Sequence, residues 1–205
     1  ETAYTLYIGI ALLHLPVIAA MLLTAVVCSV LGVLIEKIAY KPLRNAPPLA
    51  VLITAIGMSY FLQSVALLIF SSTPIPFKSV INLDSVQVGS VNISGITIVT
   101  LVVTTVIMVA LTLFINKTKA GSAMRAVSED RGAAELMGIN VNGTISMTFA
   151  IGSALAAVAG ILYICQYQSL RPTLGALPGI KAFVAAVLGG IGSVPGAMLG
   201  VIVMG

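Results

Sequence analysis

Long stretches of this chain carry no charged side chain, and their lengths constrain the fold more than any other feature. Each stretch exceeds the roughly 20 apolar residues that cross the hydrocarbon core of a bilayer as a helix. The sequence therefore predicts a polytopic membrane protein. The charge-free stretches lie between Glu1 and Glu36, Arg44 and Lys78, Asp84 and Lys117, and Glu135 and Arg171, and after Lys181.

The composition supports helices rather than a barrel. Only 8% of the residues are charged, against about 25% in soluble proteins. A membrane barrel needs short segments of alternating polarity, and residues 15–35 show no alternation. We predict an all-α transmembrane helix bundle that forms one domain over residues 1–205, and we interpret the chain as a fragment truncated at both ends. The five predicted spans lie near residues 15–35, 49–70, 96–115, 144–164 and 182–205.

One polar segment, residues 116–143, interrupts the apolar sequence. It holds seven of the chain's sixteen charged side chains, which are ten basic and six acidic. Lys and Arg gather in residues 36–48 and 116–143, whereas residues 71–95 carry only Lys78. Because basic residues favour the cytoplasmic side, we predict that residues 116–143 form a cytoplasmic loop and residues 71–95 an outer loop. Alternating Val and Ile with turn-forming residues predict a small β-hairpin near residues 86–93.

A short helix over residues 129–137 is predicted inside the cytoplasmic loop. Ser128 is a suitable N-cap, and Glu129 and Asp130 place negative charge in the first turn, where the helix dipole favours it. Gly138 can adopt the left-handed conformation that ends a helix.

Three apolar residues of this helix, Ala133, Leu136 and Met137, fall at positions i, i+3 and i+4 and form one face. About nine residues are too few for a stable helix in water, so this one needs a surface to pack on. The sequence leaves three such surfaces open: the lipid interface, the protein's own helix ends, or a partner protein.

Polar residues inside the spans are the candidates for a substrate path. In the second span, Ser59 and Gln63 lie one turn apart on one face, and the same span carries Thr54. An amide in hydrocarbon is costly unless it is hydrogen-bonded, so Gln63 is expected to face inward. Bonding between helices explains that orientation as well as substrate contact does. Thr24 and Ser29 in the first span are expected to bond their own helix carbonyls.

Glycines recur in the last predicted span. Gly192, Gly196 and Gly200 repeat every fourth residue, which favours close packing of helices. Alternatively, Gly189-Gly190 with Pro195 breaks this segment into a re-entrant or discontinuous helix.

The sequence predicts no enzymatic centre. It has one His, and all six carboxylates are expected outside the spans, so no catalytic residue, metal ligand or nucleic-acid contact is assigned. Cys28 and Cys165 are interpreted as small buried hydrophobic residues.

Several blocks, taken in order, resemble the branched-chain amino acid permease of the Liv-H type, a subunit of ABC importers. They lie within residues 36–47, 52–63, 123–140, 149–160 and 181–196. Residues 132–138, Gly-Ala-Ala-Glu-Leu-Met-Gly, also resemble the Glu-Ala-Ala-x-x-x-Gly loop with which such permeases dock on their ATPase, although Gly132 stands in place of the glutamate.

The resemblance implies a multi-pass permease of the bacterial inner membrane that imports branched-chain or other small neutral amino acids. Its implied partners are ABC ATPase subunits, a second permease subunit, an extracytoplasmic binding protein and the lipid bilayer. The second permease subunit would be homologous and form a heterodimer with this chain. Arg171 is the candidate contact for the binding protein. ATP and Mg would bind the ATPase, with no cofactor on this chain. A permease for urea or short amides and a passive channel or scaffold remain the alternatives. The residues implied in ATPase coupling are Glu129, Asp130, Ala133, Ala134, Glu135, Leu136, Met137 and Gly138.

Overall fold

The computed structural model describes the chain in two compact units, which are treated one at a time. Unit one comprises Glu1–Asn82 and Gly132–Pro172, and unit two comprises Leu83–Arg131 and Thr173–Gly205. The single permease domain stays a prediction. The described residues are 2–9, 16–44, 46–70, 75–76, 86–88, 91–167, 169–170, 173–190 and 194–204.

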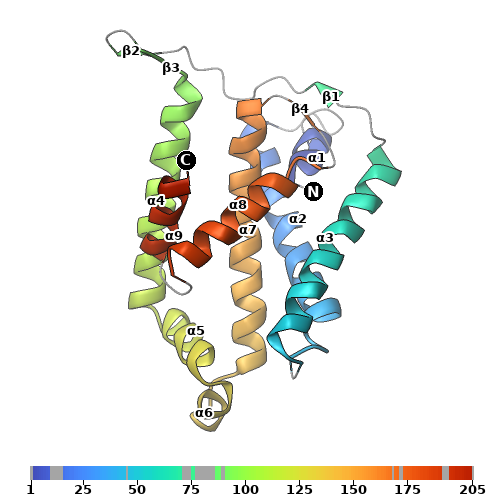
Figure 1. The fold of residues 1–205 in the computed structure, drawn as a ribbon, viewed down its shortest axis with the longest axis vertical. Coiled ribbons are helices and arrows are strands. Elements are labelled where there is room, and N and C mark those ends of the chain that lie inside the picture. The colour runs from blue at the N-terminus through green and yellow to red at the C-terminus, as the bar shows by residue number, and fades with distance from the viewer. Residues whose placement is uncertain are drawn as a thin grey trace. The chain divides into compact units, whose positions relative to one another are not determined.

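Unit one is built around two long helices, α2 and α7, which lie side by side (Figure 1). Their contact is close because Gly32 on α2 has no side chain: a Cβ placed there would lie 1.8 Å from Ser153 Oγ on α7. Its helices and strands are α1 (Thr2–Tyr7), α2 (Val17–Ile35), the π-helix η2 (Glu36–Tyr40), α3 (Pro48–Phe70), β1 (Ile75–Pro76), α6 (Arg131–Leu136, of which Arg131 belongs to unit two), α7 (Val141–Tyr167) and β4 (Ser169–Leu170).

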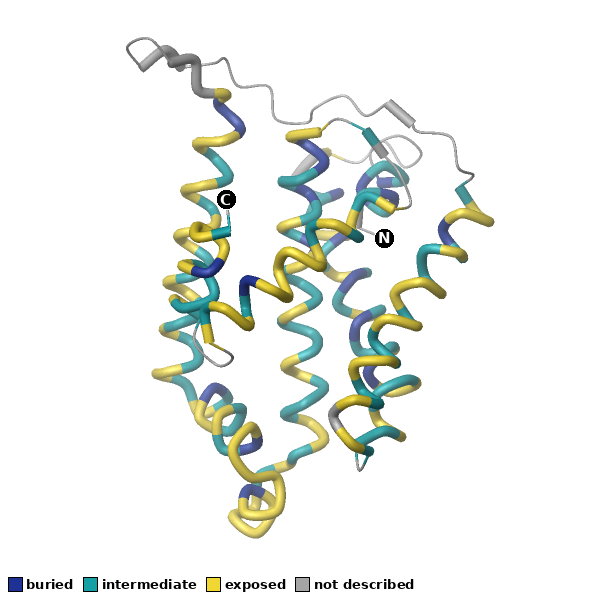
Figure 2. Tube along the Cα trace, viewed as in Figure 1, coloured by how far each residue is buried: buried dark blue, intermediate teal, exposed yellow. Residues whose placement is uncertain are grey.

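The third helix, α3, contributes little to this core. It contacts η2 at its start, and most of its apolar side chains are exposed (Figure 2). The buried side chains of unit one instead lie mainly on α1, α2 and α7, and include Leu6, Ala20, Thr24, Ala157, Ile161 and Ile164.

Two sets of contacts define the ends of unit one. At one end β1 pairs antiparallel with β4, which joins the segment after α3 to the segment after α7. At the other end η2 contacts the beginning of α7. The connections therefore alternate between the two ends, as the charge distribution predicts, with residues 36–48 and the end of the predicted cytoplasmic loop together.

Unit two holds α4 (Gly95–Lys117), α5 (Lys119–Glu129), α8 (Ala176–Leu188) and α9 (Val194–Met204), with strands β2 (Val86–Val88) and β3 (Val91–Ile93). The strands pair antiparallel, Val86 opposite Ile93, which confirms the predicted hairpin.

Among the described residues, four helices are long and apolar enough to cross a membrane, which confirms the first four predicted spans and the all-α membrane bundle. Their bounds are Ala19–Tyr40, Leu49–Phe70, Gly95–Lys117 and Val141–Tyr167. Together they indicate a multi-pass membrane protein.

A fifth continuous span over residues 182–205 is wrong. The chain there forms two shorter helices, because α8 ends at Leu188 and Gly190 adopts a left-handed φ of 90°. The two helices then pack tightly: a Cβ on Gly200 would lie 2.2 Å from the Ala185 carbonyl oxygen. The discontinuous helix and the packing role of a glycine are therefore both present in this segment.

Candidate functional site

The predicted cytoplasmic loop begins with a helix, α5, that the sequence reasoning missed. The Thr118 hydroxyl accepts a hydrogen bond from the Gly121 amide at 3.0 Å, which caps the helix start. Gly121 permits a close approach, since a Cβ there would lie 2.3 Å from the Ile115 carbonyl oxygen at the end of α4. Apolar residues at 120, 123, 124 and 127 have helical spacing and could have revealed α5.

The predicted helix over residues 129–137, with Ser128 as its N-cap, is wrong at its start. Ser128 lies inside α5, where its hydroxyl donates to the Arg125 carbonyl oxygen at 2.7 Å. Glu129 is the last residue of α5, and Asp130 is extended (φ −148°, ψ 112°). The next helix, α6, begins only at Arg131.

The predicted end of this short helix at Gly138 is confirmed. Gly138 has a left-handed φ of 80°, and no described atom lies within 4 Å of the position of a Cβ there. The amides of Gly138 and Ile139 donate to the carbonyls of Glu135 and Ala134 at 2.9 and 3.0 Å, which satisfies the helix end.

The two large apolar residues at the end of α6 project into solvent. Leu136 is 91% exposed and Met137 82% exposed, whereas Ala134 is only 3% exposed. The helix therefore packs through Ala134 and presents Leu136 and Met137 outward, so packing on the protein's own helix ends does not account for these two side chains. We call Leu136 and Met137 the apolar tip.

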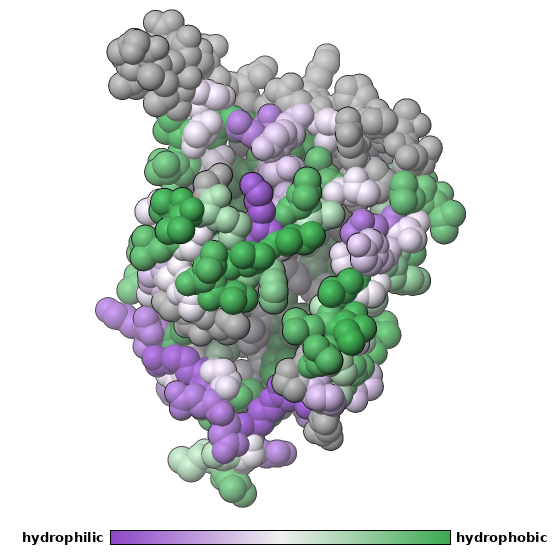
Figure 3. Space-filling model, viewed as in Figure 1, coloured by the Kyte–Doolittle hydropathy of each residue, from purple (hydrophilic) through white to green (hydrophobic). Residues whose placement is uncertain are grey.

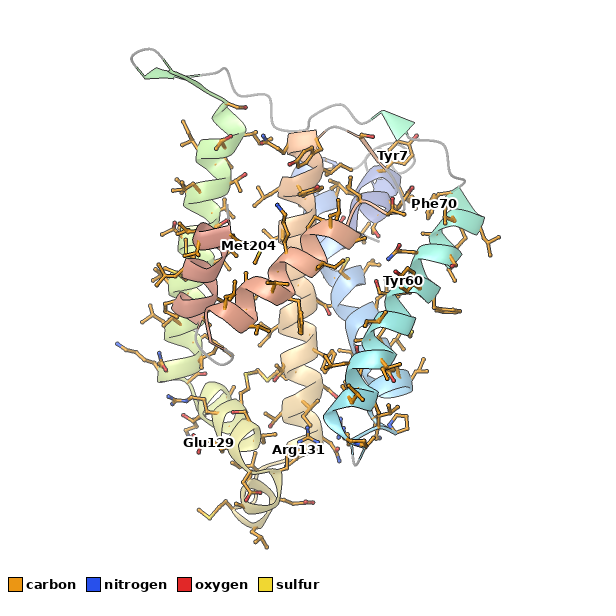
Figure 4. All side chains as sticks on the ribbon, viewed as in Figure 1. Tyr7, Tyr60, Phe70, Glu129, Arg131 and Met204 are labelled. Carbon is orange, nitrogen blue, oxygen red and sulfur yellow. The ribbon has the colours of Figure 1, made fainter. Side chains whose placement is uncertain are left out.

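Charged residues neighbour the apolar tip in sequence. Glu135 is exposed beside it, and Glu129 and Asp130 are exposed in unit two, at and just after the end of α5. Figure 4 labels Glu129 and Arg131 on this part of the chain, and Figure 3 shows hydrophilic surface over α5. Within unit one, the apolar tip therefore has one exposed acidic neighbour in sequence, Glu135.

The candidate path residues on α3 behave differently from one another. Gln63 Nε2 donates to Ser59 Oγ at 3.2 Å, so the predicted pair shares a face and is in contact. Gln63 is half-buried and Ser59 exposed. The Thr54 hydroxyl donates to the Ala50 carbonyl oxygen of its own helix at 2.8 Å.

Two predictions about the first span are confirmed: Thr24 and Ser29 donate to the Ala20 and Ala25 carbonyl oxygens at 2.7 and 2.8 Å. Cys28 and Cys165 are buried, also as predicted. Arg171 lies outside the described residues.

A buried ionic cluster in unit one was missed by the sequence reasoning. The prediction that all carboxylates lie outside the spans is wrong for Glu36, which is fully buried within the candidate span Ala19–Tyr40. One carboxylate oxygen of Glu36 pairs with Arg44 Nη2. The other accepts a hydrogen bond from Ser146 Oγ on α7 at 2.7 Å. The only sequence signal was an acidic residue at the edge of an apolar run, with Arg44 eight residues later.

The described part of the chain holds four apolar helices long enough to span a membrane, a broken apolar segment and a short polar-loop helix with an exposed tip, which define the class of multi-pass membrane proteins. A family model described as branched-chain amino acid transport system, permease component, matches residues 2–205. The chain belongs to this family.

Similar curated proteins carry the same description. The high-affinity branched-chain amino acid transport system permease protein BraD of Pseudomonas aeruginosa is 46% identical over 96% of this chain and 66% of its own length. The permease protein LivH of Salmonella typhimurium is 42% identical over 99% of this chain and 67% of its own length. LivH of Escherichia coli is 45% identical over 88% of this chain and 60% of its own length. No solved structure matches.

Proposed function

We propose that this chain is the translocating part of an ATP-driven importer permease for branched-chain or other small neutral amino acids. The chain spans about two thirds of the length of the curated relatives it matches. In this proposal the chain performs no chemistry itself. An ABC ATPase subunit binds ATP and Mg and hydrolyses ATP. The permease converts the resulting closure of the ATPase into alternating access.

The observation that carries the proposal is the apolar tip of α6. The six-residue helix α6 buries Ala134, whereas Leu136 at its end and Met137 just after it are exposed. Two large apolar side chains exposed together favour contact with another surface. The resemblance of residues 132–138 to the importer docking loop favours an ATPase over lipid as the cover. Glu129, Asp130 and Glu135 would supply the acidic contact that Gly132 cannot make, and Ala133 and Gly138 would set the shape of the tip.

Disrupting the apolar tip tests the docking directly. The variant Leu136→Asp/Met137→Asp is expected to reach the membrane but to lose ATPase co-purification and substrate uptake, because two charges would enter an apolar cleft. The control is Asn142→Asp, which adds a charge at an exposed position in the first turn of α7, outside the apolar tip, and is expected to keep both. Retained co-purification and uptake in the double variant would refute the proposal and would favour a passive channel or scaffold.

The substrate path is proposed to pass the Ser59 and Gln63 pair on α3, with Thr54 on the same helix. Gln63 Nε2 and Ser59 Oγ are hydrogen-bonded to one another at 3.2 Å. A zwitterionic amino acid or a short amide could replace this bond with its own hydrogen bonds to the two side chains. Ser59 and Gln63 are therefore better placed for contact than Thr54, whose hydroxyl already bonds its own helix.

The path is tested by Gln63→Leu, which is expected to raise the KM for uptake while leaving ATPase assembly intact. Thr105→Val is the matched control, because that exposed hydroxyl on α4 bonds only the Leu101 carbonyl oxygen in its own helix among the hydrogen bonds described. An unchanged KM in Gln63→Leu would remove Gln63 from the path. Competition of uptake by leucine, by urea and by acetamide would separate the amino-acid permease from a permease for urea or short amides.

The remaining partners are proposed on the resemblance. They are a second, homologous permease subunit forming a heterodimer, an extracytoplasmic binding protein on the side of the outer loop 71–95, and the bilayer of the bacterial inner membrane. Co-purification of the tagged permease with a stoichiometric amount of one different, homologous permease chain is the expected result.

A further inference from the structure

The cluster of Glu36, Arg44 and Ser146, which we call the ionic joint, links three separate parts of unit one. Glu36 opens η2 at the end of α2, Arg44 lies in the connection before α3, and Ser146 lies in the second turn of α7. Each carboxylate oxygen serves a different neighbour: Oε1 pairs with the Arg44 guanidinium and Oε2 accepts from the Ser146 hydroxyl at 2.7 Å. One buried side chain thus joins residues 110 apart in the sequence.

The position of Glu36 is unusual in two independent ways. It is fully buried inside a candidate membrane span, where an ionisable group is costly unless its partners satisfy it and so marks function more often than packing. It also begins a five-residue π-helix, in which its carbonyl oxygen accepts from the Lys41 amide at 2.8 Å. Single π turns are rare and frequently occur at functional sites.

The ionic joint lies close in the chain to the apolar tip. Only residues 137–140 separate α6 from α7, and Gly138 fixes their turn with its left-handed backbone. Asn140 Oδ1 accepts from the Gly143 amide at 3.0 Å and so caps α7 at its first turn. A displacement of α6 is therefore passed to the first turns of α7, where Ser146 lies.

The contact of η2 with α7 continues beyond the carboxylate. Tyr40 at the end of η2 and Phe149, one turn beyond Ser146, are in ring contact, with centroids 5.2 Å apart. Farther along, Gly32 and Ser153 bring the backbones of α2 and α7 together. Two apolar surfaces can slide past each other gradually. A buried charge that loses its partner is left with an uncompensated desolvation cost. The ionic joint therefore favours discrete arrangements of α2 against α7.

We propose that Glu36 is a positioning residue that, through Arg44 and Ser146, transmits movement of α6 into α2 during transport. This inference rests on the proposed function, because it assumes that an ATPase moves α6. The joint contacts neither substrate nor ATPase; it sets how far α2 follows α7.

The test is the amount of substrate taken up per ATP hydrolysed, measured in proteoliposomes that hold the assembled transporter and a loaded binding protein. Ser146→Ala removes only the hydrogen bond between α7 and Glu36. It is expected to keep ATPase assembly and hydrolysis while uptake per ATP falls about fivefold or more, the size of a typical coupling between sites. Ser146→Thr, which keeps a hydroxyl, is expected to restore the ratio.

Thr148→Val is the matched control, since the hydroxyl of Thr148, also on α7, bonds the Thr144 carbonyl oxygen of its own helix. It is expected to keep the wild-type ratio. Glu36→Gln provides a second test, because it retains the shape of Glu36 and removes the charge; it is expected to lower uptake per ATP as Ser146→Ala does. A merely structural role would lower the melting temperature and the yield without changing the ratio.

A wild-type ratio in both Ser146→Ala and Glu36→Gln would overturn the inference. If one of them fails to accumulate and the other couples normally, or if neither accumulates, the ionic joint serves folding and the inference is equally overturned. Failure of the proposed function looks different, because the unsubstituted permease itself would then show no ATPase assembly or ATP-dependent uptake.

Discussion

Two consecutive helices of unit one, α2 and α3, have similar hydropathy and very different surroundings. Both are apolar enough to span a membrane, with mean hydropathies of 2.3 and 1.9. In the structure 28% of the first span is buried against 6% of the second. The polar groups differ too: α2 leads into the buried ionic joint, and α3 carries the more exposed Ser59 and Gln63 pair.

Hydropathy therefore identifies a membrane span but not the contacts that the span makes. One side of α2 packs against α7, while Leu22, Val26 and Val30 on α2 stay exposed. The helix α3 keeps its side chains available for lipid, a second subunit or a substrate. Changes on α2 should therefore lower stability more than equivalent changes on α3.

The largest expected contrast is between Glu36→Leu and Gln63→Leu. Glu36→Leu takes from Arg44 the carboxylate it pairs with and from Ser146 its acceptor, and breaking a buried ion pair costs about 3 kcal/mol. Gln63→Leu removes an amide from a mainly exposed helix and should change the free energy of unfolding by less than about 0.5 kcal/mol. Thermal melts of both variants in one detergent compare them, and equal melting temperatures would refute the contrast between the helices.

A smaller contrast is expected between two glycines. Gly32→Ala places a Cβ 2.6 Å from Ser153 Cβ, so α2 and α7 must separate, at a cost of about 1–3 kcal/mol. Gly57→Ala on α3 meets no described atom within 4 Å and should stabilise the helix by about 0.5 kcal/mol. Opposite shifts in melting temperature are the expected result; a loss of stability in Gly57→Ala would mean that α3 is tightly covered at that position.

The smallest contrast concerns threonines that bond their own helices. Thr24→Val on α2 and Thr54→Val on α3 each remove one hydroxyl that donates to a carbonyl one turn earlier. The carbonyl keeps its backbone partner, so each change should cost less than about 1 kcal/mol. Urea or thermal denaturation measures both, and a larger loss in Thr24→Val alone would reveal a further role for that buried hydroxyl.

The sequence was most informative where the signal is local. Charge-free lengths predicted four spans, alternation predicted the β2 and β3 pairing, and a glycine after an apolar pair predicted the helix end at Gly138. These features depend on residues within one or two turns of each other, so no knowledge of the packing was needed.

Predictions failed where two structures competed for the same residues. Ser128 has the chemistry of an N-cap, but α5 continues through it and its hydroxyl bonds the Arg125 carbonyl instead. The last apolar stretch is long enough for a span, but the left-handed Gly190 favours two short helices. The ionic joint was beyond reach because Ser146 lies 110 residues from Glu36, and which face of α7 meets α2 is decided only by packing.

The apolar tip of α6 is proposed to contact an ATPase subunit, whereas exposed positions on α3 are not. A photo-crosslinking amino acid at Leu136 tests it in membranes, with the same group at Gly57 on α3 as the reference position. We predict a covalent product between the permease and the ATPase from position 136 and none from position 57. An ATPase product from neither position, with both proteins present in the membrane, would contradict the account.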